Sequence, residues 1–117
     1  GAIIECRRFQ IGDGVVNKDL VELAHEQLFL LFKDVIDKLL DGEELNGEVQ
    51  KEGRYFGLKE LERKKLICED ESIESIDNKI RAFWNPPYSG AQIEIKGKRY
   101  TVINEHIISW IADKIRK

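Results

Sequence analysis

A long amphipathic segment between residues 17 and 40 constrains the fold of this chain more than any other feature of its sequence. Its apolar side chains recur three or four positions apart, which places them on one face of a helix. They are Leu20, Leu23, Ala24, Leu28, Leu31, Val35, Ile36 and Leu39. Asn17 is suited to begin such a helix and Gly42 to end it. Phe29, Leu30 and Phe32 widen the apolar face, which predicts either burial on two sides or a surface for a domain outside this chain.

Shorter elements are expected before and after this helix. Residues 3–11 alternate imperfectly between apolar and polar side chains, which is typical of a half-buried strand. Residues 43–57 are rich in Glu, Gly and Asn and predict a loop with a short extended piece. A short helix is expected over residues 58–65. Asp70 or Ser72 can then cap a further helix, which the proline pair at residues 86–87 ends.

A β-hairpin and a last helix are expected at the end of the chain. Two alternating segments, residues 91–95 and 98–103, flank a two-residue turn in which Gly97 can supply a positive φ angle. Asn104 can cap a final helix that carries an apolar face. The sequence therefore predicts an α+β fold with an N-terminal strand, a long amphipathic helix, two shorter helices, a β-hairpin and a C-terminal helix.

Size and charge narrow the classes of function. A chain of 117 residues suits one domain with one modest core. Its net charge of −3 creates no general attraction for nucleic acid or anionic lipid. No apolar run is long enough to cross a bilayer, and the start lacks the layout of a signal peptide, so we expect a cytoplasmic protein without a membrane partner.

No residue stands in a recognisable catalytic or metal-binding pattern. The glycines of residues 12–14 lack the third glycine or the lysine of a phosphate-binding loop. The cysteines and histidines come from four distant segments without the short spacing of a metal site; they are Cys6, His25, Cys68 and His106. We therefore predict no catalytic residue and no metal site in this chain, and free thiols at both cysteines.

The densest cluster of basic, aromatic and proline residues lies between residues 79 and 88. A rigid proline pair holds neighbouring side chains at fixed angles. The simpler interpretation is packing, in which the aromatic rings fold the hairpin back onto the preceding helix. The alternative is contact with a ligand, for which the substrate-side candidates are Tyr55, Arg81 and Trp84.

Basic and aromatic residues also interleave in the hairpin. Lys96, Lys98 and Arg99 adjoin Tyr100, an arrangement that can contact a phosphate backbone while the ring stacks on a base. A lysine-rich hairpin also discourages pairing at its edge, and the acidic total opposes tight binding to nucleic acid. A small RNA-binding or protein-interaction module is therefore the alternative, less favoured function.

The cluster before the hairpin carries a resemblance to a known family. Ile80-Arg81-Ala82-Phe83, followed by Pro86-Pro87-Tyr88-Ser89-Gly90-Ala91 and a hairpin, resembles the C-terminal, post-catalytic region of the formyltransferases. That family includes methionyl-tRNA formyltransferase and the N-formyltransferases of nucleotide-linked amino sugars. Residues 3–11 resemble the strand that closes the family's catalytic domain, and residues 17–40 resemble the helix after it.

The resemblance implies that the chain is one part of a larger enzyme. In such enzymes an Asn, a His and an Asp of the N-terminal domain transfer the formyl group from formyl-tetrahydrofolate to an amine. We therefore expect residues 1–16 to be the tail end of the catalytic domain, residues 17–90 a helical linker region, and residues 91–117 a hairpin plus helix. The missing N-terminal catalytic domain is the expected partner, and formyl-tetrahydrofolate is the cofactor of the parent enzyme, with none bound by this chain alone.

The resemblance also implies a substrate class and a homodimer. Only a hairpin and one helix follow the motif, whereas methionyl-tRNA formyltransferases continue into a β-barrel, so a nucleotide-linked amino sugar is favoured as acceptor. One face of the hairpin is apolar and suits a subunit interface. Its candidate interface residues are Ile93, Ile95, Tyr100 and Val102. Burial of this face in the core of the monomer is the alternative.

Overall fold

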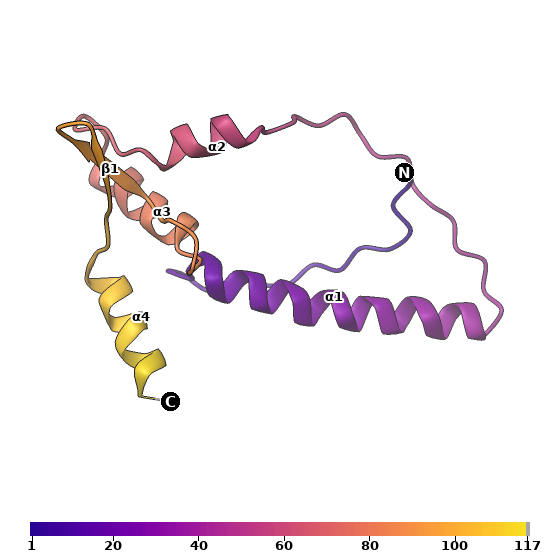
Figure 1. The fold of residues 1–117 in the computed structure, drawn as a ribbon. Helices are drawn as coiled ribbons and strands as arrows, with labels where there is room; N and C mark the ends of the chain where they lie inside the picture. The colour runs from indigo at the N-terminus through magenta and orange to yellow at the C-terminus, as the bar shows by residue number, and fades with distance from the viewer. Residues whose placement is uncertain (117) are drawn as a thin grey trace. The chain divides into compact units, whose positions relative to one another are not determined.

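The computed structural model describes residues 1–116, and within them four helices and one β-hairpin confirm the α+β class (Figure 1). The helices are α1 (Asn17–Leu40), α2 (Leu58–Lys65), α3 (Ile73–Phe83) and α4 (Glu105–Ile115). The hairpin consists of β1 (Gln92–Ile95) and β2 (Lys98–Thr101), paired antiparallel.

The N-terminal strand is the one predicted element that does not form. Within residues 3–11, only Ile3 pairs, in an isolated antiparallel bridge whose two N–H···O bonds with Glu48 are each 2.7 Å long. A strand needs a neighbouring strand along its whole length, because its backbone groups form their hydrogen bonds there. The segment instead leaves Ile3, Ile4 and Ile11 exposed.

The described chain forms two compact units. The first contains residues 1–13 and 19–55, and the second contains residues 14–18 together with residues from 56 onward. The second unit has the buried core, formed by Val16, Ile80, Ala91 and Ile107. Half-buried side chains pack around these four, namely Ile67, Ile76, Trp84, Val102, Trp110 and Ile111.

Local sequence signals set the bounds of the elements in the second unit. Ser72 accepts a hydrogen bond of 3.1 Å from the Ser75 N–H and so begins α3. Asn104 does the same for α4, accepting from the Ile107 N–H at 3.1 Å. Gly97 closes the hairpin with a φ of 78°, as the two-residue turn requires.

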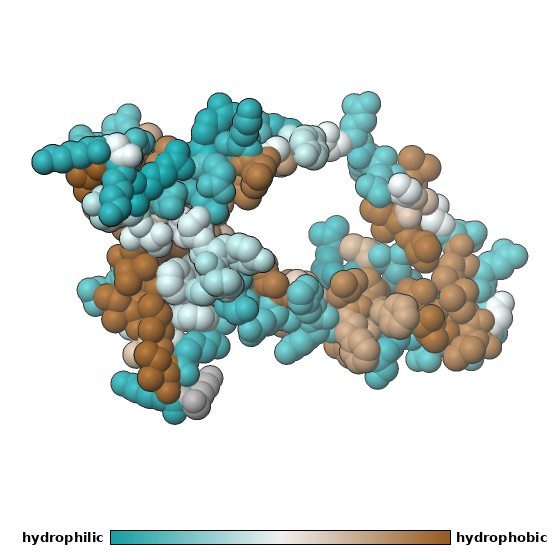
Figure 2. All heavy atoms as spheres, in the orientation of Figure 1, coloured by the Kyte–Doolittle hydropathy of each residue, from teal (hydrophilic) through white to brown (hydrophobic). Residues whose placement is uncertain are grey.

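The first unit consists mainly of α1, and no side chain of this helix is buried. Phe29 is 62% exposed and Phe32 is 59% exposed, and Figure 2 shows brown, hydrophobic side chains along the part of the chain labelled α1. The expected burial of the apolar face on two sides is therefore wrong for the described residues. The reason is that, besides α1, the first unit contains only segments without helix or strand, residues 1–13 and 41–55, which offer this helix little packing surface.

Two ion pairs join that extended segment to α1. Nζ of Lys38 lies 2.8 Å from Oε2 of Glu5, and a guanidinium nitrogen of Arg7 lies 3.2 Å from Oδ2 of Asp34. The hydrogen bond from Lys38 lowers the pKa of Glu5. No helix within residues 1–116 combines the length and the apolar character that crossing a membrane requires.

Candidate functional site

The motif residues that suggested a family lie at the C-terminal end of α3 and in the turn after it. Ile80 is buried in the core, and Trp84 ends the helix by donating its N–H to the Arg81 carbonyl at 3.3 Å. The carbonyl of Trp84 accepts from the Lys18 N–H at 2.8 Å. The next turn contains a cis bond between Pro86 and Pro87. The motif therefore joins α3, the hairpin and the start of α1 within the second unit.

Trp84 takes part in the packing of this unit. Its ring meets that of Trp110 edge to face, with 6.0 Å between ring centres and 84° between ring planes. Its indole Nε1 is buried and has no hydrogen-bond partner among the described residues. The position supports the packing interpretation of this aromatic cluster, and contact between Trp84 and a ligand stays a prediction.

Arg81 lines an open hollow of about 560 Å³ between α3 and the start of α4. Its guanidinium donates to the side-chain oxygen of Asn78, one turn earlier. On the α4 side, Asn104 donates to Asp77 at 3.1 Å, and Nε2 of His106 lies 2.7 Å from the Gly14 carbonyl oxygen. The hollow is thus polar, and hydrogen bonds between neighbouring elements hold its side chains in place.

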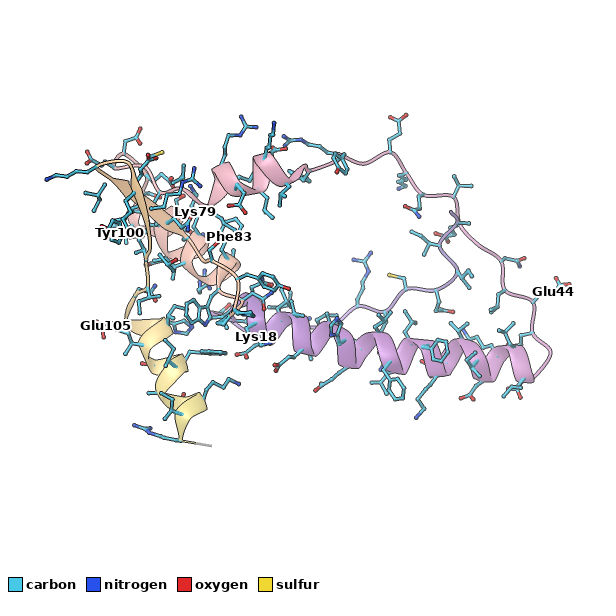
Figure 3. All side chains as sticks on the ribbon, in the orientation of Figure 1. Lys18, Glu44, Lys79, Phe83, Tyr100 and Glu105 are labelled. Atoms are coloured by element: carbon cyan, nitrogen blue, oxygen red, sulfur yellow. The ribbon has the colours of Figure 1, made fainter. Side chains whose placement is uncertain are left out.

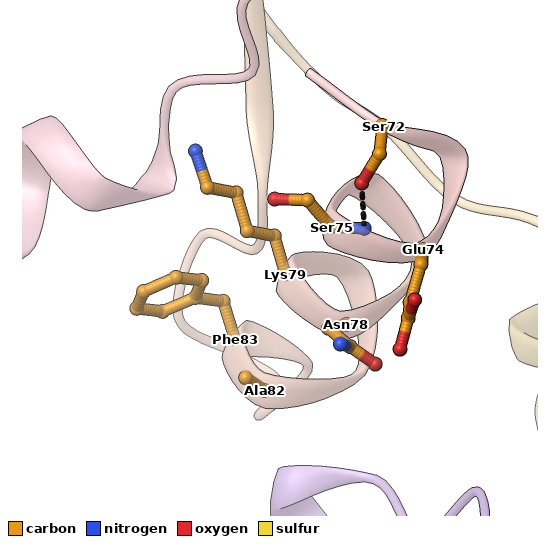
Figure 4. A pocket seen from close by; sticks show the side chains of 7 residues that line it. All are labelled: Ser72, Glu74, Ser75, Asn78, Lys79, Ala82 and Phe83. Atoms are coloured by element: carbon orange, nitrogen blue, oxygen red, sulfur yellow. Dashed lines mark hydrogen bonds between the residues drawn. The ribbon is translucent and has the colours of Figure 1, made fainter.

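A second hollow, of about 380 Å³, lies along α3, and Lys79 and Phe83 extend to the same side of the helix there (Figures 3 and 4). Nζ of Lys79 donates to Glu71 at 2.6 Å and to the Leu66 carbonyl at 2.7 Å. Glu71 also accepts from the Cys68 N–H and the Ser75 hydroxyl. These hydrogen bonds, led by that from Lys79, lower the pKa of Glu71 to about 2.

Lys65, which the sequence did not single out, is the one buried charged side chain in the described part of the chain. Its Nζ lies 3.3 Å from the Ser89 hydroxyl and 3.3 Å from Oε1 of Glu62. It also lies 6.0 Å from the centre of the Phe83 ring. The signal was present in the sequence, because Leu58, Leu61 and Lys65 follow one another at helical spacing and so share one face of α2.

Tyr55, the third substrate-side candidate, is 89% exposed and belongs to the first unit. Arg81 and Trp84 belong to the second unit and lie three residues apart at the end of α3. The structure therefore separates Tyr55 from the other two candidates, and places Arg81 at a hollow and Trp84 half-buried against the core.

The apolar face of the hairpin divides into two parts. At its base, Ala91 and Val102 join the core of the second unit. At its tip, Ile95 is 51% exposed and Tyr100, which is opposite Ile93 in the register, is 46% exposed. Burial in the monomer thus accounts for the base of this face and leaves the tip exposed.

The basic residues of the hairpin strands are divided between its two faces. Nζ of Lys98 lies 5.3 Å from the centre of the Tyr100 ring, whereas Arg99 alternates to the other face of the strand, where it is opposite Glu94. Lys98 therefore shares the face of Tyr100, Arg99 lies on the opposite face, and RNA binding by the hairpin stays a prediction.

Hydrogen bonds between its own residues orient the polar side chains of this site. Within residues 1–116, no three His, Cys, Asp or Glu side chains group as a metal site would require. The two cysteines are free and exposed. The polar residues around α3 are hydrogen-bonded to one another, as described above.

The comparisons with known proteins bear on the fold. The sequence matches no family model and no curated protein. The structure is similar to the crystal structure of a 4-N formyltransferase from Francisella tularensis, with a TM-score of 0.75 and 21% sequence identity. The likeness covers 90% of this chain and 45% of that protein, so the chain spans less than half its length. This chain therefore has the fold of one part of a formyltransferase.

Proposed function

We propose that this chain is the C-terminal accessory region of a formyltransferase-like enzyme. The parent enzyme would transfer a formyl group from formyl-tetrahydrofolate to an amine, with a nucleotide-linked amino sugar as acceptor. The observation that carries the proposal is the shared fold over 90% of the chain. The segment with the formyltransferase-like sequence motif lies within this fold as a core helix end, a proline turn and the hairpin base.

In this proposal the catalytic residues lie in a separate N-terminal α/β domain, and this chain alone is not catalytic. The exposed apolar side chains of the first unit support such a partner. Ile4 is 53% exposed and Phe29 62% exposed, and a contiguous exposed apolar surface is typical of an interface. Residues 1–16 would complete the sheet of that domain, residues 17–90 would link it to the rest, and residues 91–117 would form the hairpin and last helix.

An amino-sugar acceptor agrees better with the hairpin than an RNA does. Lys98 lies beside the Tyr100 ring, but Arg99 alternates to the other face, opposite the acidic Glu94, so the cations of the hairpin are not gathered around the ring on which an RNA base would stack. Arg81, at the polar hollow of the second unit, is the side chain best placed to reach an acceptor.

Formyl transfer by the full-length protein tests the proposal. The protein would be incubated with formyl-tetrahydrofolate and either a nucleotide-linked amino sugar or methionyl-tRNA, and the formylated product would be measured by mass spectrometry. We expect a product from the amino sugar and none from residues 1–117 alone. Formylation of methionyl-tRNA alone would show that the acceptor is methionyl-tRNA and not an amino sugar. The absence of formylation of any amine would refute the proposal.

The exposed tip of the hairpin supports a homodimer as part of this proposal. Changing Ile95 to Lys and Tyr100 to Ser would convert the dimer to a monomer in sedimentation experiments, because both side chains are about half exposed and apolar. Glu94→Ser is the matched control, since Glu94 alternates to the other face. A protein that is monomeric before any substitution would contradict the dimer.

A further inference from the structure

Three cationic side chains from two separate elements line one open hollow of the second unit. Lys59 and Arg63 come from α2, and Arg99 comes from β2. The hollow has a volume of about 520 Å³ and is also lined by Leu58 and Glu62. The bridge between Leu66 and Gln92, with an Ile67 N–H···O bond of 2.8 Å, holds the end of α2 against β1.

None of these three cations forms an ion pair with a carboxylate among the residues that the structure describes. Glu62, the acidic residue at the hollow, is 3.3 Å from Lys65. Glu94 is opposite Arg99 in the hairpin register, without an ion pair between them. Among the described residues, the three cations thus outnumber the acidic side chain that lines the hollow and are not held in ion pairs.

This concentration of positive charge is a local feature, because the chain as a whole has a net charge of −3. Lys59 and Arg63 are four residues apart on α2, a spacing at which like charges destabilise a helix. A bound anion would relieve that repulsion. Arginine presents a planar fork of N–H donors that matches the oxygens of a phosphate, and lysine adds a point charge.

We propose that Lys59, Arg63 and Arg99 form a binding site for a phosphorylated small molecule. The two guanidinium groups would hold the phosphate oxygens, and Lys59 would add charge at the helix surface. Leu58 is 73% exposed and would contact an apolar part of the ligand. The site uses none of the residues assigned to the acceptor side or to the hairpin interface, so it stands apart from formyl transfer.

Titration of the full chain with inorganic pyrophosphate tests this site. Binding would be followed by calorimetry and by the side-chain NMR signals of the arginines. We expect saturable binding that moves the signals of Arg63 and Arg99, and tighter binding of pyrophosphate than of phosphate. Arg63→Gln and Arg99→Gln should each weaken binding about tenfold or more, as expected for the loss of hydrogen bonds to a charged group.

Lys96→Gln is the matched control, because Lys96 is an exposed cation in the hairpin turn, outside the hollow. It should change the affinity by less than about twofold, since screening weakens its interaction with a distant anion. Circular dichroism of each variant would establish that it is folded. If an arginine variant is unfolded, Lys59→Gln replaces it, with weaker binding as the expected result.

Uridine diphosphate, as a second probe, distinguishes a free anion from an organic phosphate. If uridine diphosphate binds more tightly than pyrophosphate, and this difference disappears in Leu58→Ala, the ligand is an organic phosphate. If the two probes bind equally tightly, the ligand is the free anion. Three outcomes would overturn the site: no saturable binding, equal weakening in Lys96→Gln, or binding of single-stranded RNA without binding of pyrophosphate.

Discussion

Lys79 and Glu71 form a short ion pair, with 2.6 Å between Nζ and Oε1. Their side chains are only 24% and 17% exposed. The same ammonium group donates to the Leu66 carbonyl at 2.7 Å, so the pair ties α3 to the segment that leads from α2. The ion pair between Lys79 and Glu71 stabilises the folded chain only while the Glu71 carboxyl group is ionised.

The stability added by Glu71 should therefore depend on pH. Its pKa falls from an ordinary 4.5 to about 2 in the folded chain, so the folded state favours the ionised form. The contribution is complete above pH 4.5 and is lost as the pH falls from there to about 2. Urea unfolding of the original chain and of Glu71→Gln should give clearly different stabilities at pH 7, and the difference should shrink steadily below pH 4.5.

Glu74→Gln is the control for this experiment, because Glu74 lies on the same helix and forms no described ion pair. Its effect should be small at every pH. A difference between the original chain and Glu71→Gln that stays constant from pH 7 to pH 2 would contradict the assigned role of ionised Glu71.

Trp84 should stabilise the folded chain through the packing of its ring, and its indole N–H should contribute nothing. Trp84→Ala removes a half-buried ring that packs on the core, and should lower the free energy of unfolding by about 3 kcal/mol. Trp84→Phe keeps a ring and removes a buried N–H that has no partner among the described residues, so it should cost much less. Urea unfolding followed by circular dichroism distinguishes the two. An equal loss in both variants would point to a hydrogen bond of the indole.

The hairpin turn should be sensitive to backbone conformation at Gly97. Its φ is 78°, and nothing lies within 4 Å of the position that a Cβ would take. Gly97→Ala should therefore destabilise the chain by about 1 kcal/mol through the backbone alone. Lys96 also has a positive φ, of 50°, so Lys96→Asn should raise stability, because Asn tolerates this region well. Thermal unfolding measures the stability of both variants. A Gly97→Ala variant as stable as the original chain would contradict the positive φ at this turn.

The exposed phenylalanines of α1 should contribute little to the stability of the isolated chain. Phe29 and Phe32 are 62% and 59% exposed, so Phe29→Gln and Phe32→Gln should each change the free energy of unfolding by less than about 0.5 kcal/mol. Both should reduce the fluorescence of a dye that binds apolar surface. Leu31→Gln, at a half-buried position, is the control and should cost more. A large loss in the Phe29 and Phe32 variants would show that these rings are buried in solution.

The sequence predicts the elements whose formation depends on nearby residues. The caps at Ser72 and Asn104, the turn glycine and the period of α1 all act within a few positions, and the structure confirms each element they predict. The predicted N-terminal strand does not form, because a strand depends on a neighbouring strand, and that is a property of the whole fold. Periodicity also identifies an apolar face without showing what covers it, as α1 demonstrates.

The site residues were harder to predict for a related reason. The sequence singles out residues 79–88, and the structure places Arg81 at a hollow and Trp84 half-buried against the core. The approach of Arg99 to Lys59 and Arg63 has no signature in the sequence, because it depends on how β2 packs relative to α2.

The core of the second unit has a consequence for synthesis of the protein. Val16, near the start of the chain, is buried in the same cluster as Ile107, near its end, and residues 19–55 belong to the other unit. On the ribosome, Val16 emerges long before Ile107 is translated, so this core is completed only after Ile107 has emerged. Contacts so distant in sequence form slowly. Until then the nascent chain exposes apolar residues of both units, and we expect it to need a chaperone or a partner domain more than its size suggests.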